Sequence, residues 1–536
     1  MNSCSCIRPK KLEKCVGWRK LLQQFAPTMK KENKIWQVIT ASSLGTLIEW
    51  YDFYIFGSLA TVIAGQFFPK TNPTAALLST LATFAAGFIV RPFGALVFGR
   101  LGDLVGRKYT FLLTLVLMGG STFAIGLVPS YESIGFAAPI IVLTLRLLQG
   151  LALGGEYGGA ATYVAEHAPV GKRGYYTSWI QTTATLGLFV SLSVILFTRH
   201  SLDIDPAVSI AKFNAWGWRI PFLFSIVLVG VSIYIRLKMQ ESPLFSKLKS
   251  EGAISVNPLK ESFGNKENLK MVLLALFGAT MGQGVVWYTG QFYAQSFIEN
   301  VCKIDFDQSR TILIWAILFG TPLFVVFGSW SDKIGRKWIM LAGMFLAVIT
   351  YKPLFKGLLE LSDTETKTEV VAAATIKIDS VAIPNAQNFV RTIASKIFFT
   401  DGTELSTITT DTLYANPVQT TVKPVVKISK VLANGVYWKM VLIVFIMIVY
   451  VTMVYGPIAA FLVELFPTKI RYTSMSLPYH IGNGVFGGLT PFIATLLTTM
   501  YTADALAGLQ YPIIVAAVSV IIGTLYLDSK INTKHD

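Results

Sequence analysis

Long apolar stretches recur along nearly the whole chain, and they constrain the fold more than any other feature of the sequence. Runs such as 111–126, 222–234 and 440–455 contain no charged residue. Hydrophobic residues make up 53% of the chain and charged residues only 14%, whereas soluble domains carry about 25% charged residues. A bilayer core about 30 Å thick needs roughly 20 apolar residues per helix. The sequence therefore predicts an all-α integral membrane protein.

The apolar stretches predict twelve transmembrane helices in two groups of six. The first group is expected at 36–61, 75–98, 109–128, 136–165, 174–197 and 218–238, and the second at 270–298, 310–329, 338–356, 439–463, 474–499 and 511–527. The domains that follow are an N-terminal tail (1–35), a first half (36–238), a Lys-rich central loop (239–269), a second half (270–527) and a C-terminal tail (528–536).

Lys and Arg are concentrated in alternate segments, which include the N-terminal tail and the central loop. Loops rich in these residues stay in the cytoplasm, so we expect both termini there, in the plasma (inner) membrane. The net charge of +16 is spread between the apolar stretches, which argues against nucleic acid as a partner. Cys4 and Cys6 have no second pair nearby, so no metal site and no cofactor is predicted.

Residues 357–437 interrupt the second half and are not typical of a transporter. Asp401-Gly402 lies between two short apolar runs, which is a hairpin signal, and residues 425–431 alternate with the period of a strand. The expected topology places this segment outside the membrane. The sequence thus predicts a small β-rich extracytoplasmic insert.

Two loop motifs occur once in each half. Gly-x-x-x-Asp-x-x-Gly-Arg-Lys begins at Gly99 and at Gly328, and Glu-x-x-Pro-x-x-x-Arg begins at Glu166 and at Glu464. Two related six-helix halves, one of them carrying the insert, account for this repeat, and such a plan puts the substrate site near the midplane between the halves. The candidate gating residues are Gly99, Asp103, Gly106, Arg107, Glu166, Arg173, Asp332, Gly335, Arg336, Glu464 and Arg471.

These motifs resemble the major facilitator superfamily and, within it, the metabolite:H⁺ symporter family, which includes carriers of proline and betaine, α-ketoglutarate, shikimate and citrate. The resemblance extends from about Val38 to Leu527. It implies the major facilitator fold and a gating role for the repeated loops, whose alternative role is that of a topology signal only. The stretches that carry it are 47–54 (LIEWYDFY), 91–94 (RPFG), 146–150 (RLLQG), 154–158 (GGEYG) and 218–222 (WRIPF).

Two carboxylates, Glu49 and Asp52, lie well inside the first apolar span. A charge at the bilayer centre costs about 2.5–3.5 kcal/mol on insertion scales, so such residues usually face a cavity or a partner. Their i, i+3 spacing puts them on one helical face, and two neighbouring buried carboxylates suit the binding and release of a proton. A structural ion pair with Arg91 or Arg146 is the alternative.

Arg146, Gln149 and Glu156 share one face of the fourth helix, and the resemblance links Arg146 to proton coupling. Proton coupling is therefore assigned to Glu49, Asp52, Arg146 and Glu156. A fixed arginine can also hold a substrate carboxylate bidentately, although a salt bridge for Arg91 and ordinary packing for the seventh helix remain alternatives. The predicted substrate contacts are Arg91, Gln149, Tyr157, Gln283, Trp287, Tyr288, Gln291, His480 and Asn483.

Symport of H⁺ with a small polar metabolite by alternating access accounts best for these features. The sequence contains no Gly-x-x-x-x-Gly-Lys-Ser/Thr phosphate loop and no catalytic motif, which argues against an ATP-driven pump and against an enzyme. A transporter-derived receptor is the alternative, but the central loop lacks a long signalling domain. The two arginines favour an organic acid over a zwitterion such as proline or betaine. We expect a monomer in the lipid bilayer.

Overall fold

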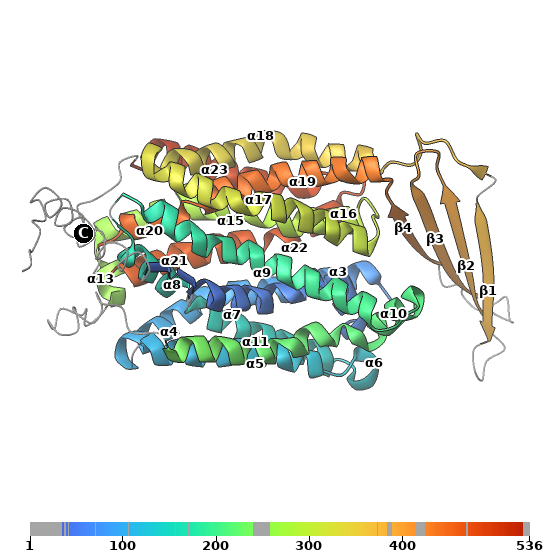
Figure 1. The fold of residues 1–536 in the computed structure, drawn as a ribbon, viewed down its shortest axis with the longest axis horizontal. Coiled ribbons are helices and arrows are strands. Elements are labelled where there is room, and N and C mark those ends of the chain that lie inside the picture. Colours follow the sequence, from blue (N-terminus) through green and yellow to red (C-terminus); the bar gives the residue numbers. More distant parts are fainter. Residues whose placement is uncertain are drawn as a thin grey trace, which may run out of the picture.

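The computed structural model contains a bundle of long helices with a small β-sheet at one end (Figure 1). It describes residues 35–36, 39–40, 42–69, 71–105, 107–155, 157–169, 171–238, 258–371, 374–382, 389–413, 424–467 and 470–528. For some of these residues, including 99–105, 107–112 and Tyr157, it describes the backbone but not the side chain.

Each predicted span of the first half is matched by a helix or a broken helix. The first span is broken after Ser58, where the helix Ser42–Ser58 meets α2 (Ala60–Phe67) at an angle of 63°. The other spans are α3 (Pro73–Ile89) with α4 (Arg91–Val105), α5 (Arg107–Leu127), α7 (Ala137–Gly154) with α8 (Tyr157–His167), α9 (Arg173–Ser201), and α11 (Arg219–Lys238). Short connecting helices are α6 (Tyr131–Ile134), α10 (Pro206–Lys212) and η1 (Phe213–Gly217).

The second half contains the remaining six spans. They are preceded by the short helix α13 (Pro258–Gly264). The seventh span runs through α14 (Lys266–Ala275), η2 (Leu276–Thr280), α15 (Met281–Tyr288), η3 (Thr289–Tyr293) and α16 (Ala294–Asn300). The next three are α17 (Phe306–Ile334), α18 (Arg336–Ser362), and α19 (Asn434–Tyr455) with α20 (Ile458–Leu465). The eleventh span runs through α21 (Arg471–Tyr479), η5 (His480–Gly487) and α22 (Thr490–Met500), and the last is α23 (Gln510–Tyr526), which follows η6 (Ala507–Leu509).

Three of these segments, η2, η3 and η5, are π-helical, and they lie in the seventh and eleventh spans. A π-helical turn holds an extra residue, so it rotates the side chains that follow, and such turns are frequent at functional sites. These two spans also carry all of the predicted substrate contacts of the second half.

Helices α9 and α17 lie side by side along the contact between the two halves (Figure 1). Their close approach depends on Gly174 and Gly328, because a Cβ atom built on Gly174 would clash with the carbonyl oxygen of Gly328. Side chains such as Phe197 and Leu525 are exposed on the outside of the bundle, where a membrane protein presents apolar groups to lipid.

The predicted insert forms a four-stranded antiparallel sheet in the order β1-β2-β3-β4. Its strands are β1 (Thr375–Ala382), β2 (Phe389–Phe398), β3 (Glu404–Leu413) and β4 (Val425–Val431). The predicted hairpin at Asp401-Gly402 is confirmed, because it joins β2 to β3 and Gly402 has a φ of 88°. The ninth helix continues to Ser362 rather than ending at 356, because Leu358 and Ser362 in its last turns are still buried against the bundle.

The sheet and α13 lie at opposite ends of the bundle (Figure 1). We call the end that carries the sheet the outer end and the end that carries α13 the inner end. β4 is attached to the bundle by backbone hydrogen bonds, since the Asp305 N–H donates to the Lys430 carbonyl (2.8 Å) and the Lys430 N–H donates to the Lys303 carbonyl (2.7 Å).

Candidate functional site

Arg91, at the start of α4, is buried between the two halves with 1% of its surface exposed. Its guanidinium carbon lies 4.1 Å from the ring centre of Phe88, 4.4 Å from that of Phe53 and 5.6 Å from that of Trp50. Its Nε and Nη2 atoms have no hydrogen-bond partner among the described residues. A buried guanidinium with unused donors is suited to hold an anion.

Arg146 is also fully buried, but most of its donors are used within the first half. Its Nη1 donates to Gln149 Oε1 (2.7 Å) and to the Phe53 carbonyl (3.4 Å), and its Nη2 donates to the Phe84 carbonyl (3.5 Å). Gln149 in turn donates to Thr122 Oγ1 (2.6 Å). The predicted proximity of Arg146 and Gln149 is therefore present, and it gives Arg146 a fixed position beside the central site.

The seventh span faces this site from the second half. The Trp287 ring stacks on Tyr54 (5.3 Å), and Tyr54 stacks on Trp50 (4.9 Å), so a row of three rings crosses from one half to the other. The buried side chains of Gln283 and Gln291 have no hydrogen-bond partner among the described residues. Because an unpaired buried amide is costly, these side chains suit a polar ligand.

Predicted contacts from the seventh and eleventh spans surround the same region. Tyr288 packs edge-on against Phe88 at 5.1 Å. Asn483 donates to the Tyr479 hydroxyl (3.0 Å), and His480 is buried with its ring 5.3 Å from that of Tyr479. The Tyr479 hydroxyl also bonds to that of Tyr455 (2.8 Å). Sequence reasoning missed both tyrosines and the aromatic residues around Arg91, because aromatic residues are common in every span.

The first-span carboxylates are both buried, each 1% exposed. Asp52 does not pair with Arg91 or Arg146 in the described part of the chain, and its Oδ1 has no hydrogen-bond partner there. Its Oδ2 lies 3.3 Å from the position that a Cβ on Gly119 would take. Asp52 therefore faces the third span, so the alternative of a structural ion pair with these arginines does not hold for it.

Several predicted residues lie outside what the structure describes. Glu156 and Gly106 are in the gaps, and for Asp103, Arg107 and Tyr157 only the backbone is described. Gly99 lies within α4.

The second copy of the Gly-x-x-x-Asp-x-x-Gly-Arg-Lys loop joins the halves at the inner end. Asp332 accepts hydrogen bonds from the backbone N–H groups of Gly174 and Tyr175, both at 2.8 Å, at the N-terminus of α9. A carboxylate is favourable there because of the unsatisfied N–H groups and the helix dipole. Arg336 pairs with Asp332 (2.6 Å) and with Glu464 (2.9 Å), so it connects this cap to the tenth span.

Other predicted gating residues support the same closure. Arg471 approaches Glu166 across the halves, with 3.9 Å between Nη1 and Oε1. Gly335 has a φ of 95°, which permits the tight turn between α17 and α18, and Arg173 is the first residue of the capped helix α9. The motif that begins at Gly328 and both Glu-x-x-Pro-x-x-x-Arg motifs therefore meet at the inner end.

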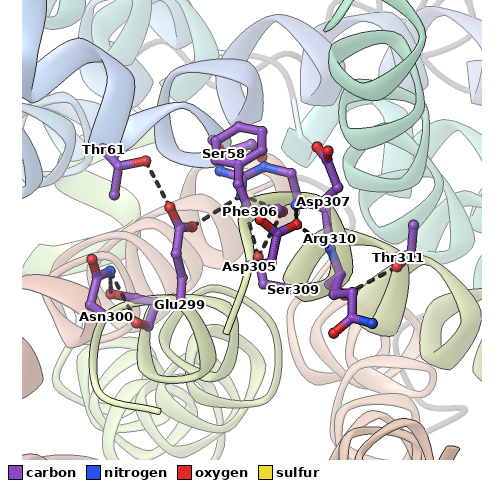
Figure 2. A network of polar contacts seen from close by, with 12 residues as sticks. Ser58, Thr61, Glu299, Asn300, Asp305, Phe306, Asp307, Ser309, Arg310 and Thr311 are labelled. Carbon is purple, nitrogen blue, oxygen red and sulfur yellow. Dashed lines mark hydrogen bonds and ion pairs between the residues drawn. The ribbon is translucent and has the colours of Figure 1, made fainter. Parts of the chain in front are cut away.

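A polar network at the outer end was missed by sequence reasoning (Figure 2). Arg310 Nη1 donates to Glu299 Oε2 (3.1 Å), and Arg310 Nη2 donates to the carbonyl of Ser58 (2.6 Å) in the other half. Thr61 donates to Glu299 Oε1 (2.8 Å). The signal that could have found this network is the presence of two charges near the ends of apolar spans, which is the reasoning used for Glu49 and Asp52.

A second outer contact joins α9 to α17. Arg199 Nε lies 2.8 Å from Asp307 Oδ1, and His200 Nε2 lies 3.2 Å from Asp307 Oδ2. The two halves are therefore held together at both the inner and the outer ends, with the central residues enclosed between them.

The fold is similar to that of a solved transporter. The structure of the "MFS (major facilitator superfamily) proton:xylose symporter XylE" matches with a TM-score of 0.62 and 17% identity, over 92% of this chain and 95% of that one. A family model described as "Sugar (and other) transporter" matches residues 38–256. The inner membrane metabolite transport protein YhjE of Escherichia coli (strain K12) is 30% identical over 490 residues, which are 90% of this chain and 91% of that protein.

The chain belongs to the major facilitator superfamily. It is accordingly a multi-pass membrane transporter and not an enzyme. Among its other relatives, an α-ketoglutarate permease of Escherichia coli (strain K12) is 35% identical, over 61% of this chain and 73% of that protein. A proline/betaine transporter of the same organism is 34% identical, over 61% of this chain and 66% of that protein.

Proposed function

We propose that this transporter couples the entry of protons to the uptake of a small organic acid or zwitterion by alternating access across the plasma (inner) membrane, with both termini in the cytoplasm. The observation that carries the proposal is the environment of Arg91. Its buried guanidinium has two unused donor atoms between the halves, and a substrate carboxylate would satisfy them.

The named substrates of the relatives support this solute class. α-Ketoglutarate, proline and betaine all contain a carboxylate, and proteins named for them align with most of this chain. Around Arg91, the aromatic rings of Trp50, Phe53 and Phe88 can accommodate the apolar or cationic part of such a solute.

Proton coupling is proposed for Asp52, with Glu49 on the same helical face. Asp52 is buried away from both central arginines, and burial in an apolar setting disfavours a bare charge. A carboxyl group in this position suits the binding of a proton during one stage of the cycle.

Purified protein in liposomes tests the proposal. A panel of dicarboxylates, hydroxy acids, proline and betaine would be examined by counterflow and then by uptake driven by an imposed pH gradient. We expect counterflow of at least one carboxylate and its accumulation only when the outside is more acidic. Arg91→Gln is expected to abolish both activities. Specific binding without any counterflow would instead indicate a receptor.

A further inference from the structure

A small cavity of about 20 Å³ lies between the two halves at the outer end. Its lining includes Ser58, Phe84, Phe292, Gln295, Glu299 and Arg310. The rings of Phe84 and Phe292, 5.5 Å apart, line the cavity, and Phe84 also contacts the Arg146 guanidinium at 5.0 Å. The cavity has room for about one water molecule in this closed arrangement.

Three buried polar atoms that belong to residues lining this cavity have no hydrogen-bond partner among the described residues. They are Ser58 Oγ, Gln295 Oε1 and Arg310 Nε. Gln295 is 5% exposed and Arg310 is 1% exposed. Unpaired polar atoms at such a position are costly, so their presence indicates a site that a polar ligand occupies at another stage of the transport cycle.

Arg310 presents its two edges to different partners. Nη1 is occupied by Glu299 and by the Phe306 carbonyl (3.0 Å), whereas the opposite edge, Nε and Nη2, holds only the Ser58 carbonyl. That carbonyl is available because the first span breaks directly after Ser58. A carboxylate can bind bidentately along one edge of a guanidinium, and this edge is the one that faces the other half.

We infer that this cavity, when α2 has moved away, is an outer capture site for the carboxylate of the transported solute. The inference rests on the proposed function. The Nε/Nη2 edge of Arg310 binds the incoming carboxylate in the outward-open state and returns to the Ser58 carbonyl once the solute has passed inward. Glu299 holds Arg310 in position through the opposite edge, and the Thr61–Glu299 hydrogen bond closes α2 over the empty site.

The surrounding charges are compatible with an anionic ligand. Glu299 compensates Arg310, and the neighbouring Asp307 is paired with Arg199 and lies near His200. Thr61 from α2 is uncharged. The release of one Arg310 edge therefore offers two donors to a carboxylate, while Glu299 stays paired with Nη1 of the same guanidinium.

The capture site can be tested by comparing transport from the outer face of the membrane with transport from the inner face. Uptake of a carboxylate that the wild type transports would be measured from the outer face in intact cells and from the inner face in everted membrane vesicles. Arg310→Lys keeps the charge but loses the bidentate edge. We expect it to raise the outer KM about tenfold, since one strong hydrogen bond is lost, and to leave the inner KM and the dependence on the pH gradient unchanged.

Thr61→Val is the matched control, because it removes the hydrogen bond that closes α2 and leaves Arg310 intact. Its outer KM should not rise. Glu299→Gln provides a second variant, which should raise the outer KM by releasing Arg310 from its position. An unchanged outer KM in Arg310→Lys, or an equal rise on both faces, would overturn the capture site while leaving the proposed function standing. A wild type that neither takes up nor exchanges any carboxylate would overturn both.

Discussion

Asp52 is the residue on which proton coupling depends in this account. It lies in the helix Ser42–Ser58 of the first span, and the last residue of this helix supplies the carbonyl bound by Arg310. A change in the charge of Asp52 against the third span would therefore act on the same helix that closes the outer end. This connection gives a residue-level reason for proton binding and outer opening to be coupled.

Replacement of Asp52 by Asn tests this role. We expect Asp52→Asn to abolish accumulation against a gradient, because an amide cannot carry the proton, while exchange of solute continues. One proton can support about fifty-fold accumulation per 100 mV, so the loss is large. The measurement is the steady-state solute ratio in energised vesicles, with Glu49→Gln in parallel. Undiminished accumulation in both variants would contradict the assignment.

Asp332 provides a second test at the scale of a residue. Asp332→Asn removes the charge that caps α9 and the ion pair with Arg336, so we expect the inner closure to weaken by about 1–2 kcal/mol. Single-molecule distances between the inner ends of the halves would report a larger inward-open population. Asp103→Asn changes the equivalent position of the first half and should act in the same direction. If neither variant changes the distance distribution, the loops act as topology signals only.

At the scale of an element, the contact of α9 with α17 brings the two halves together. Glycine is needed where the two helices approach, since a side chain at Gly174 would meet the backbone at Gly328. The hydrogen bond from the Gly174 N–H to Asp332 needs the same close packing of α9 and α17.

Gly174→Ala is therefore expected to reduce uptake severalfold at a normal membrane level, because the added methyl group separates the helices. Initial rates of uptake, normalised to the amount of protein in the membrane, measure the effect. Gly120→Ala is the control, since nothing lies within 4 Å of a Cβ built there. Equal rates in the two variants would show that α9 and α17 need not approach so closely.

The β-sheet takes no part in the proposed transport mechanism. The ends of the insert lie close together, since Lys430 Nζ donates to the Ser362 carbonyl (2.7 Å). A folded insert with adjacent ends adds little strain to its host.

We expect replacement of residues 363–433 by a short flexible linker to leave proton-coupled transport largely intact. Membrane level and initial rate of uptake would be measured together, so that misfolding is separated from loss of function. Normal membrane level with lost uptake would place the insert within the transport mechanism.

At the scale of the whole molecule, the two halves are joined at both ends, and alternating access requires one end to open at a time. Asp332 and Arg471 join the inner end, whereas Asp307 and Arg310 join the outer end. When the outer end opens, the outer contacts must therefore break while the inner contacts remain. When the inner end opens, the inner contacts must break while the outer contacts remain.

A double variant, Arg199→Cys with Asp307→Cys, tests this exclusivity. A short, membrane-impermeant thiol cross-linker should hold the outer ends of α9 and α17 together and stop net uptake, with recovery when a cleavable linker is cut. Cys302 is buried and should not react, and the single substitutions Arg199→Cys and Asp307→Cys serve as controls. Full uptake by completely cross-linked protein would contradict alternating access through this outer opening.

The sequence by itself predicted the apolar spans, the repeated loops and the Asp401-Gly402 hairpin. These features depend on local properties, namely the length of an apolar run, the spacing of charged residues and the backbone preference of a turn. The relatedness of the halves also made the contact between them the expected place of the substrate site.

The tertiary structure alone decided which partners the buried polar groups find. The π-helical segments of the seventh and eleventh spans, the tyrosines beside Asn483 and the direction of Asp52 toward Gly119 all depend on packing between distant helices. The outer site shows the reason most directly. The break after Ser58 frees a carbonyl that must be satisfied in an apolar setting, and its donor, Arg310, is 252 residues away. No local pattern could have joined them.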